Sequence, residues 1–598
     1  MKKNIATVGI LLSGVAPLHA QTDEVFVLDE IVVSASLEET ERSRTGATVT
    51  VVTQEELQES GETRVIEYLD RLPGVSASGN GGVGSRATLR LRGLPGRYVP
   101  VYIDGIDVTD PSSTQTAFNW GDLTTSGISR IEVLTGSQSA LYGSEAIGGV
   151  INITTTRATE EGIHYSAGIE AGSYDTVRAE LGVTSKGERA ELAFNLSHIN
   201  TNGFSAADEN AGNTEADGHE STALTFSGAY QATDTLKLGF TLLYQDSETE
   251  QDGGFPVADT AGQAFVTRKA GRVYAEIDGD VVNHSFSLSH SRTDRFFPVG
   301  FSQNFQGDRT EATYQGSTTF NDVKLAFGTS YTKEEFSVDA VSGSYDIASL
   351  FGEAQYAVND AVDISLSLRH DEHSEYGSNT TGRLALAWRA TPDTVVRASA
   401  ATGFRAPSLY ELFGPFGDPT LQPETSLSFE LGVEQKIAGG SVRATVFHTE
   451  IDDLIGFAGG TYAQVPGTSV TRGIELAAAL PISDRADFFG SYTYTNAEDQ
   501  AGNQLVRVPE HDLVLGLEAE LGGNWSGQVS FNHVAGRADD GGMAMGDYSL
   551  VNASVTYDIS DNAEAYLRIE NLLDEEYQTS AGYGTSDRAF YVGLRARF

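Results

Sequence analysis

The side chains best suited to binding chemistry in this sequence are carboxylates in two polar stretches. The first stretch holds Asp208, Glu209, Glu215 and Asp217, and the second, in the next pair of expected strands, holds Asp252 and Asp259. Hard oxygen ligands gathered from two loops suit Ca²⁺. Acidic residues are also common on solvated loops that bind no ion. The pattern therefore predicts a calcium site, with plain surface charge as the alternative.

Two further motifs have weaker claims to chemistry. His370 and His373 flank two acidic residues and could hold a metal, although a solvated loop is the default expectation. The stretch Gly79–Gly84 satisfies G-x-G-x-x-G, but it follows an expected helix and leads into an expected strand. That order is the reverse of the dinucleotide-binding context, so we expect a flexible loop instead.

Catalytic chemistry finds little support in the residues. The sequence has no cysteine, no G-x-S-x-G elbow and no H-E-x-x-H pair. We therefore expect no enzyme activity and no covalent cofactor. The 39 Lys+Arg against 83 Asp+Glu give a formal charge of −44, which disfavours nucleic acid as a partner.

The beginning of the chain is typical of a secretory signal peptide over residues 1–20. Lys2 and Lys3 precede an apolar stretch from Ile5 to Ala16, and a small residue, Ala20, ends the segment. No later run reaches the roughly 18 apolar residues that a transmembrane helix requires. An exported soluble protein and a membrane β-barrel both remain open at this point.

Alternating polarity favours the barrel. In Val362–Leu368, apolar residues occupy the even positions from 364 and polar residues the odd ones, as in a strand between two different solvents. The last strand places Phe590, Val592 and Leu594 on one face, and Arg595 and Arg597 on the other. A closed barrel with an apolar outside and a wet lumen satisfies both faces. A soluble β-sandwich is the alternative.

Length sets the size of this barrel. Residues 157–598 suffice for about 22 antiparallel strands, the size class whose lumen is plugged. The segment 46–156 has a mixed α/β texture suited to the plug: Thr53 and Glu56 form a capping box, and Val65–Leu72 has helical periodicity. We therefore predict an all-β transmembrane barrel with an N-terminal α/β plug domain inside its lumen.

A series of ordered motifs resembles the TonB-dependent outer-membrane receptors over nearly the whole mature chain. In the plug they are Leu72–Val75, Leu91–Gly93, Tyr102–Gly105, Ile131–Val133, Ser139–Ser144 and Ala146–Ile153, and in the barrel Gly403–Pro407, Leu421–Glu424, Asn571–Asp574 with Tyr577, and the terminal Phe598. One departure is Thr135–Ser137, where the family usually has Arg-Gly-Pro. Any ion pair of that arginine is therefore in doubt here.

The resemblance implies a function and a set of partners. Such receptors lie in the bacterial outer membrane among its lipids, bind a scarce bulky nutrient outside the cell, and import it when the TonB complex of the inner membrane pulls on the plug. In the segment 21–45, the residues Asp29, Glu30, Ile31, Val32, Val33, Ser34 and Ala35 resemble the TonB box. A short β-branched run can add as a strand to the edge of a partner's sheet. The alternative is a structural first strand of the plug.

The resemblance also bears on the ligand. The plug spacing, the loop at Asn80–Gly82 and the stretch Gly417–Glu424 are most similar to the cobalamin receptor branch, with ferric-siderophore receptors as the alternative. Haem receptors have a histidine in a segment where Ser408–Gly417 has none. A passive porin or an outer-membrane hydrolase needs neither a plug nor a TonB box. We therefore expect a corrinoid ligand near the substrate-binding residues Asn80, Gly81, Gly82 and Ser85.

Cobalamin receptors order their outer loops with calcium, and the resemblance narrows the expected ligands. Glu215 and Asp217 match an acidic pair of those receptors, Asp252 matches a more distant ligand, and Asp259 lies at altered spacing. The predicted metal ligands are therefore Glu215, Asp217, Asp252 and Asp259.

Overall fold

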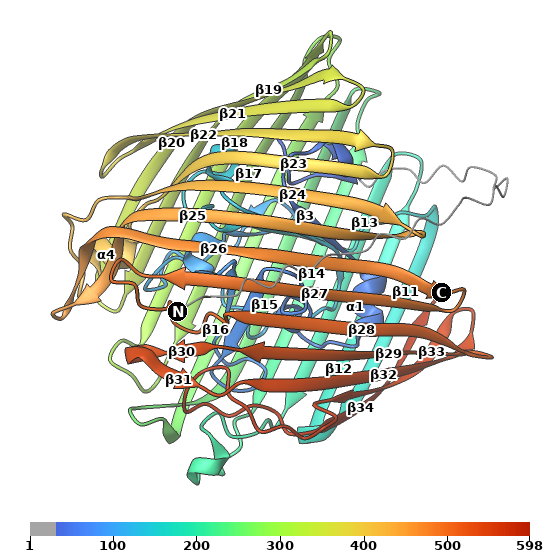
Figure 1. Ribbon diagram of the computed structural model, residues 1–598, viewed down its shortest axis with the longest axis vertical. Helices are drawn as coiled ribbons and strands as arrows, with labels where there is room; N and C mark the ends of the chain where they lie inside the picture. The colour runs from blue at the N-terminus through green and yellow to red at the C-terminus, as the bar shows by residue number, and fades with distance from the viewer. Residues whose placement is uncertain (1–30) are drawn as a thin grey trace, which may run out of the picture.

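The computed structural model describes residues 31–598, and its main body is a closed β-barrel. The predicted signal peptide, and Asp29 and Glu30 of the predicted TonB box, lie outside the described residues. The barrel has 22 antiparallel strands, and its first strand, β11 (Gly162–Gly172), pairs with its last, β34 (Ala589–Arg597), to close the cylinder (Figure 1). The predicted strand number and direction are confirmed.

Short turns join the strands at the end where the chain terminates, and the long loops lie at the other end, called here the loop end, together with a few short turns such as 339–340 (Figure 1). The longest of these loops are 202–218, 406–423 and 571–588. The loop 406–423 carries the helix α4 (Leu409–Phe413), and the loop 536–547 carries the hairpin β30 (Arg537–Asp539) and β31 (Met543–Met545). The other barrel strands are β12 (Thr176–Lys186), β13 (Ala190–Thr201), β14 (His219–Gln231), β15 (Leu236–Gly253), β16 (Ala258–Ile277), β17 (Asn283–Phe296), β18 (Asn304–Phe320), β19 (Val323–Val338), β20 (Val341–Asn359), β21 (Val362–His373), β22 (Gly377–Thr391), β23 (Thr394–Arg405), β24 (Glu424–Ile437), β25 (Gly440–Ala458), β26 (Thr461–Ser483), β27 (Ala486–Glu498), β28 (His511–Gly522), β29 (Trp525–Ala535), β32 (Tyr548–Ser560) and β33 (Ala563–Glu570).

The alternating pattern of the strands sorts their side chains between lipid and lumen. On β21, Leu366 and Leu368 are exposed on the outside, and Ser367 between them is fully buried toward the plug. On β34, Phe590, Val592 and Leu594 face outward. Because a strand has a period of two, one register satisfies both the apolar bilayer and the polar interior.

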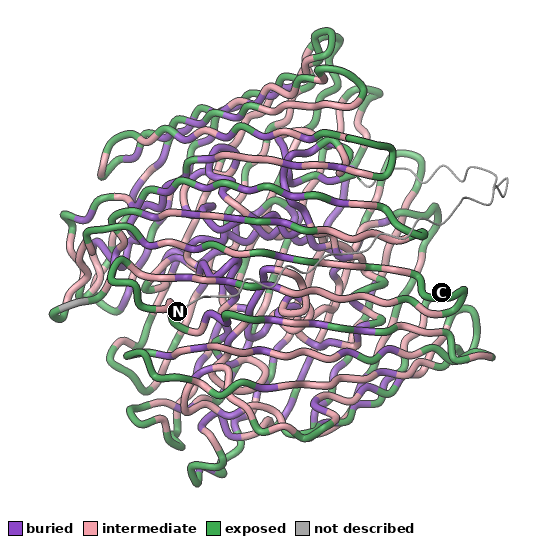
Figure 2. Tube along the Cα trace, viewed as in Figure 1, coloured by how far each residue is buried: buried purple, intermediate pink, exposed green. Residues whose placement is uncertain are grey.

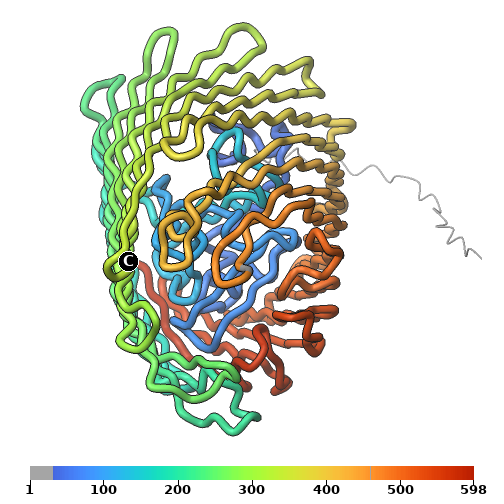
Figure 3. The backbone as a smooth tube through the Cα atoms, turned by 90° about the vertical axis from the view of Figure 1, so that its left-hand side faces the viewer, coloured from blue at the N-terminus to red at the C-terminus, as the bar shows by residue number. Residues whose placement is uncertain are grey.

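The plug fills the lumen, as the blue tube inside the barrel shows (Figure 3), and buried positions are concentrated in it (Figure 2). Its five-stranded sheet has the order β3 (Val49–Thr53), β9 (Ile128–Thr135), β10 (Gly149–Thr155), β7 (Val101–Ile103) and β8 (Ile106–Asp107). Its three-stranded sheet has the order β4 (Val75–Gly79), β5 (Ala87–Leu91) and β6 (Leu94–Pro95). Among the described residues, no helix is long and apolar enough to cross a bilayer. The helices of the plug are α1 (Gln54–Ser60), α2 (Val65–Leu69) and α3 (Ser139–Tyr142), with 3₁₀ turns at Arg42–Arg44 and Gly96–Tyr98.

Local sequence explains the first helices of the plug. The Thr53 hydroxyl accepts a hydrogen bond from the backbone N–H of Glu56, and the Glu56 carboxylate accepts one from the Thr53 N–H, so the predicted capping box forms. The helix α2 ends at Leu69, before the predicted limit at Leu72. The apolar faces of both helices pack on a core shared by both plug sheets.

Candidate functional site

The predicted substrate-binding residues lie in the loop 80–86, which joins β4 to β5 inside the barrel. The backbone N–H of Asn80 donates to the Arg86 carbonyl at 2.9 Å and so closes the base of this loop. Gly81 has a φ of 125°, in a region that favours glycine. Ser85 is buried, whereas Asn80, Gly81 and Gly82 are partly exposed.

The barrel loop 202–218 lies directly on the loop 80–86. A Cβ placed on Gly81 would lie 2.8 Å from the Cβ of Ala206, and one on Gly82 would lie 3.4 Å from the ring of Phe204. Because a side chain at Gly81 would collide with Ala206, glycine at this position lets the two loops approach closely. The loop with the predicted calcium ligands therefore contacts the loop with the predicted substrate ligands.

The structure brings three of the four predicted metal ligands into one group, and the fourth, Asp217, lies near enough to interact with Asp252 and Glu215. These four residues are called the acidic cluster here. Carboxylate oxygens of Glu215, Asp252 and Asp259 lie within 4.8 Å of one another. Asp217 accepts a hydrogen bond from the Ala206 N–H at 2.7 Å, and Asp252 accepts one from the Ala207 N–H at 2.9 Å. Two carboxylates of this acidic cluster thus also hold the part of the loop that covers Gly81.

The surroundings of Asp217 indicate whether a cation would suit this acidic cluster. Its side chain is only 6% exposed, and its Oδ1 atom has no hydrogen-bond partner among the described residues. Burial raises the pKa of Asp217 to about 7, and the charges of Asp252 and Glu215 add to this rise, although the Ala206 N–H opposes it. A divalent cation would satisfy the free oxygen and offset the repulsion, so these residues fit calcium.

The other two acidic residues of the first stretch have separate places. Asp208 caps a 3₁₀ turn at Glu209–Ala211 and accepts a hydrogen bond from the Gln578 side chain at 2.7 Å. Asp208 therefore ties the loop 202–218 to the loop 571–588.

The histidine pair does not form a joint metal site. Both residues lie within β21, where their positions fall on opposite faces: His370 is exposed, whereas His373 is buried and stacks on Tyr376 at 3.8 Å between ring centroids. Two side chains that leave a strand in opposite directions cannot bind one ion.

The plug and barrel are joined by a buried ion-pair network that the sequence analysis missed. Arg92 makes two parallel hydrogen bonds to Glu475 of β26, at 2.7 and 2.8 Å, and also pairs with Glu430 of β24. All three side chains are at most 5% exposed. The segment Thr135–Ser137 lies beside this network, since a Cβ on Gly136 would lie 3.5 Å from Glu430 and 3.7 Å from Arg92. Arg92, within the motif Leu91–Gly93, therefore supplies a plug-to-barrel ion pair although the usual Arg-Gly-Pro is missing.

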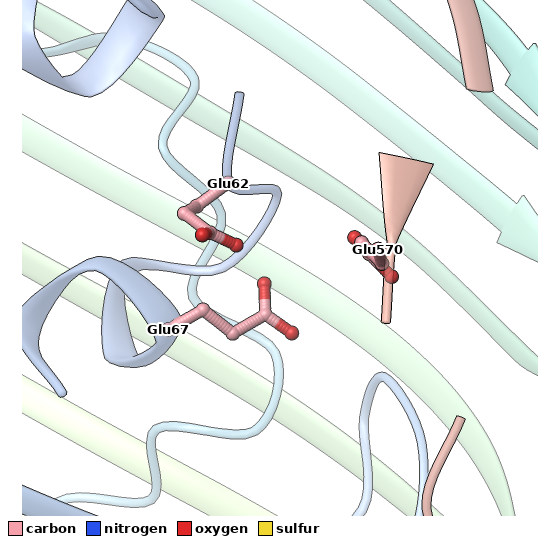
Figure 4. A group of neighbouring side chains, drawn as sticks. All are labelled: Glu62, Glu67 and Glu570. Carbon is pink, nitrogen blue, oxygen red and sulfur yellow. The ribbon is translucent and has the colours of Figure 1, made fainter. Parts of the chain in front are cut away.

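A second group of carboxylates lies where the plug meets the barrel wall, with Glu62 buried and the other two partly buried. Glu62 and Glu67 of the plug approach Glu570 at the end of β33 (Figure 4). Arginines already occupy most of their oxygens: Arg64 pairs with Glu67 at 2.7 Å, Arg568 pairs with Glu570, and Arg71 lies 3.9 Å from Glu62. Burial raises the pKa of Glu62 to about 7, with a further rise from Glu67. This group is a mixed charge network between plug and barrel.

The described part of the predicted TonB box is docked on the plug. Ile31 and Val32 form the strand β1, which pairs with β2 (Thr40–Glu41). Val32 is fully buried, whereas Ile31 and Val33 are 45% and 46% exposed. The Ser34 N–H donates to Glu132 at 3.0 Å, and the Tyr142 hydroxyl donates to the Ser34 carbonyl at 2.9 Å. The alternation of a strand is therefore present, with one face held by the plug.

Comparison with known proteins agrees with this architecture. The family model for the TonB-dependent receptor β-barrel matches residues 163–572, and the model for the TonB-dependent receptor plug domain matches residues 41–150. The chain belongs to the TonB-dependent receptor family. Members of this family are receptors and transporters of the bacterial outer membrane, so the loop end of the barrel is its extracellular end.

Individual relatives of this TonB-dependent receptor carry different names. The vitamin B12 transporter BtuB of Photobacterium profundum is 28% identical over 628 aligned positions, with 100% of each chain covered. Two solved structures share the fold of this chain, each with a TM-score of 0.80. One is the siderophore receptor PirA of Acinetobacter baumannii, which is 19% identical, with 92% of this chain and 98% of that chain covered. The other is a variant of the ferric enterobactin receptor PfeA of Pseudomonas aeruginosa, which is 18% identical, with 93% of this chain and 100% of that chain covered.

Proposed function

We propose that this TonB-dependent receptor imports a corrinoid, cobalamin or a close relative, across the outer membrane. The observation that carries the proposal is the full-length similarity to a vitamin B12 transporter, 28% identical with both chains fully covered. The ligand contacts would come from Asn80, Gly81, Gly82 and Ser85 in the loop 80–86. A ferric siderophore is the second candidate, because the solved structures with the same fold include siderophore receptors.

Calcium would order the outer part of this site. Glu215, Asp217, Asp252 and Asp259 would hold the ion, and the resulting rigidity of the loop 202–218 would fix the surface around Gly81. The acidic cluster and its free Asp217 oxygen support this assignment.

Energy for import would come through the segment Asp29–Ala35, the TonB box in this proposal, after export of the chain by the leader 1–20. TonB would bind this segment by strand addition, which relies on backbone hydrogen bonds. In the docked state Val32 is buried and Ser34 is bonded to Glu132. Binding of TonB to the buried face would therefore require release of these contacts.

The test is equilibrium binding of the purified receptor to cyanocobalamin and to a panel of ferric siderophores. Submicromolar binding of cyanocobalamin is expected. Failure to bind any corrinoid, together with binding of one ferric chelate, would replace the first candidate by the second. Proteoliposome swelling separates the receptor from a porin, because a porin would leak small solutes at once.

A further inference from the structure

Two cavities lie one after the other between the plug and one side of the barrel wall. The upper cavity, nearer the loop end, has a volume of about 210 Å³ and is lined in part by the loop 80–86. The lower cavity, of about 180 Å³, follows the lumen side of β11–β17 and reaches Arg597, near the end of the chain. Ile199 of β13 lines both cavities. Together they extend from the predicted substrate-binding loop toward the periplasmic end of the barrel.

A short piece of the plug separates the two cavities. The segment 62–65 borders the upper cavity, and the segment 122–125 borders the lower one. An isolated antiparallel bridge joins the two segments. In this bridge the Val65 N–H donates to the Leu123 carbonyl at 2.9 Å, and a second backbone hydrogen bond measures 3.0 Å. A bridge of two backbone bonds is easier to open than either sheet of the plug.

Both sides of this bridge are bonded to the loop 80–86. The Arg64 guanidinium donates to the Gly82 carbonyl at 3.2 Å. The Gly84 N–H donates to the carbonyl of Gly121, directly before the segment 122–125, at 2.8 Å. Movement of the loop 80–86 on ligand binding would therefore act on the bridge from both sides.

The barrel wall beside the lower cavity is not bonded to the plug. In the described part of the chain, the four adjacent strands β11–β14 make no hydrogen bond or ion pair with the plug residues 46–156. Arg178 of β12 lines the lower cavity and is 7% exposed, yet its Nη1 atom has no hydrogen-bond partner among the described residues. The plug can therefore move away from this wall without breaking polar contacts to it.

Another four adjacent strands, β24–β27, all hold the plug. β24 and β26 do so through the buried ion pairs of Arg92. Arg443 of β25 donates to the Thr50 hydroxyl at 3.0 Å, and the Thr493 hydroxyl of β27 accepts a hydrogen bond from the Gly74 N–H at 2.9 Å. Separation of the plug from this wall would leave buried charges without partners. The attachment of the plug is therefore strongly asymmetric.

We propose that the ligand crosses the barrel along β11–β14, through the two cavities, while the plug stays bonded to β24–β27. The bridge between the segments 62–65 and 122–125 opens, and the plug moves away from β11–β14 to widen the path for a bulky ligand. The proposal rests on the proposed function only in requiring that the receptor imports a ligand, and it applies to a corrinoid and to a ferric siderophore alike. The alternative route requires departure of the whole plug from the barrel.

Two disulfide locks distinguish these routes, because the chain contains no cysteine of its own. Gly127→Cys with Asn195→Cys would join the plug to β13, and Gly93→Cys with Ala497→Cys would join it to β27. The Cβ atoms would lie 3.2 Å apart in the first pair and 3.0 Å apart in the second. A small adjustment brings either pair to the roughly 3.5–4.5 Å of natural disulfides. The two glycines have φ values of +70° and +81°, so the strain of substitution is matched.

Uptake of radiolabelled cyanocobalamin by whole cells measures the effect of each lock, or uptake of ferric enterobactin if the parent binds that ligand instead. The oxidised β13 lock should abolish uptake, keep external binding within error, and recover uptake when reduced. The oxidised β27 lock should import at the parental rate. Loss of uptake in both locks would support departure of the whole plug and overturn the proposal. Uptake at the parental rate in the β13 lock would also overturn it.

A second variant tests the bridge without any ligand, so it remains decisive if the proposed function fails. Val65 is the first residue of α2, where proline is tolerated, and Arg64 before it has the extended backbone that proline requires. Val65→Pro removes the donor to the Leu123 carbonyl, whereas Val65→Ala shortens the side chain and keeps this donor. In proteoliposome swelling, Val65→Pro should admit arabinose about tenfold faster than Val65→Ala. Equal swelling rates would overturn the proposal.

Discussion

Arg92 of the plug and Glu475 of the barrel wall form a forked pair of hydrogen bonds, at 2.7 and 2.8 Å, although they are 383 residues apart in the sequence. Both side chains are almost fully buried, and Glu430 adds a second carboxylate to Arg92. Removal of one member of a buried ion pair leaves an uncompensated charge. This ion pair therefore helps to hold the plug in the barrel, because separating its members would leave buried charges without a partner.

Arg92→Met should lower the free energy of plug unfolding by about 3–5 kcal/mol, because Glu430 and Glu475 would lose their cation. Trp120 lies in the plug core, and Trp388 and Trp525 lie on the barrel exterior. In a protein that also carries Trp388→Phe and Trp525→Phe, Trp120 is the remaining tryptophan. Its fluorescence during urea unfolding therefore measures unfolding of the plug. Adding Glu475→Gln to Arg92→Met should recover part of the loss. Equal stability of parent and Arg92→Met would show that the network does not hold the plug.

The same fluorescence measurement should detect the titration of Glu62, whose pKa burial raises from 4.5 to about 7. The folded plug binds this proton more tightly than the unfolded chain, so its contribution to stability is complete below about pH 4.5 and is lost as pH rises through 7. In the parent, this titration should lower the free energy of plug unfolding by up to about 3 kcal/mol between pH 4.5 and 8, and Glu62→Gln should remove that decrease. Burial also raises the pKa of Asp70 to about 7, so part of the decrease in stability with rising pH should remain in Glu62→Gln. An identical pH profile in parent and variant would contradict this assignment.

Calcium should strengthen ligand binding through the acidic cluster. A chelator should weaken cyanocobalamin binding by the parent, since the loop 202–218 would lose its order around Gly81. Asp217→Asn should bind as the chelated parent does and show no response to added calcium. Glu209→Gln is the control, because Glu209 lies on the 3₁₀ turn of the same loop outside the cluster. If chelation changes nothing and Asp217→Asn matches the parent, the acidic residues are surface charge alone.

Gly84→Ala should weaken ligand binding by distorting the loop 80–86. The φ of Gly84 is +86°, and an added Cβ would lie 2.0 Å from the His219 imidazole. Strain of about 1–3 kcal/mol would be relieved by movement of the loop. Gly79→Ala is the matched control, since its Cβ would have no atom nearer than 3.7 Å. Calorimetric titration with cyanocobalamin should show reduced affinity in Gly84→Ala alone; equal affinities would mean that this backbone conformation is irrelevant to the ligand.

Val32→Pro should abolish accumulation of ligand in the periplasm and leave external binding within error. Proline removes one backbone N–H and fixes φ, which impairs strand addition to TonB. Val32→Ala keeps the backbone donor and loses about 1 kcal/mol of apolar contact, so uptake should change much less. Radiolabelled uptake in whole cells measures both. Uptake by the proline variant at the parental rate would show that Asp29–Ala35 is not the coupling segment.

The fold was predictable because its signals are local. The alternation of polar and apolar residues in Val362–Leu368 indicates, within a few residues, a strand between lipid and a polar lumen. The capping box joins Thr53 and Glu56, which are three residues apart. The predicted metal ligands could also be named, because their residue types and loop positions resemble a known pattern. Their convergence within a few ångströms was an expectation that required coordinates to examine.

By itself, then, the sequence determined the barrel, its plug and the receptor family. The tertiary structure decided which polar groups meet, such as Arg92 with Glu475 and the Ser34 N–H with Glu132. His370 and His373 look like a pair in the sequence and are separated by the pleat of β21. The physical reason is that secondary structure depends mainly on residues close in the sequence. The pairing and pKa of an ionisable side chain depend on groups that the fold brings together from hundreds of residues away.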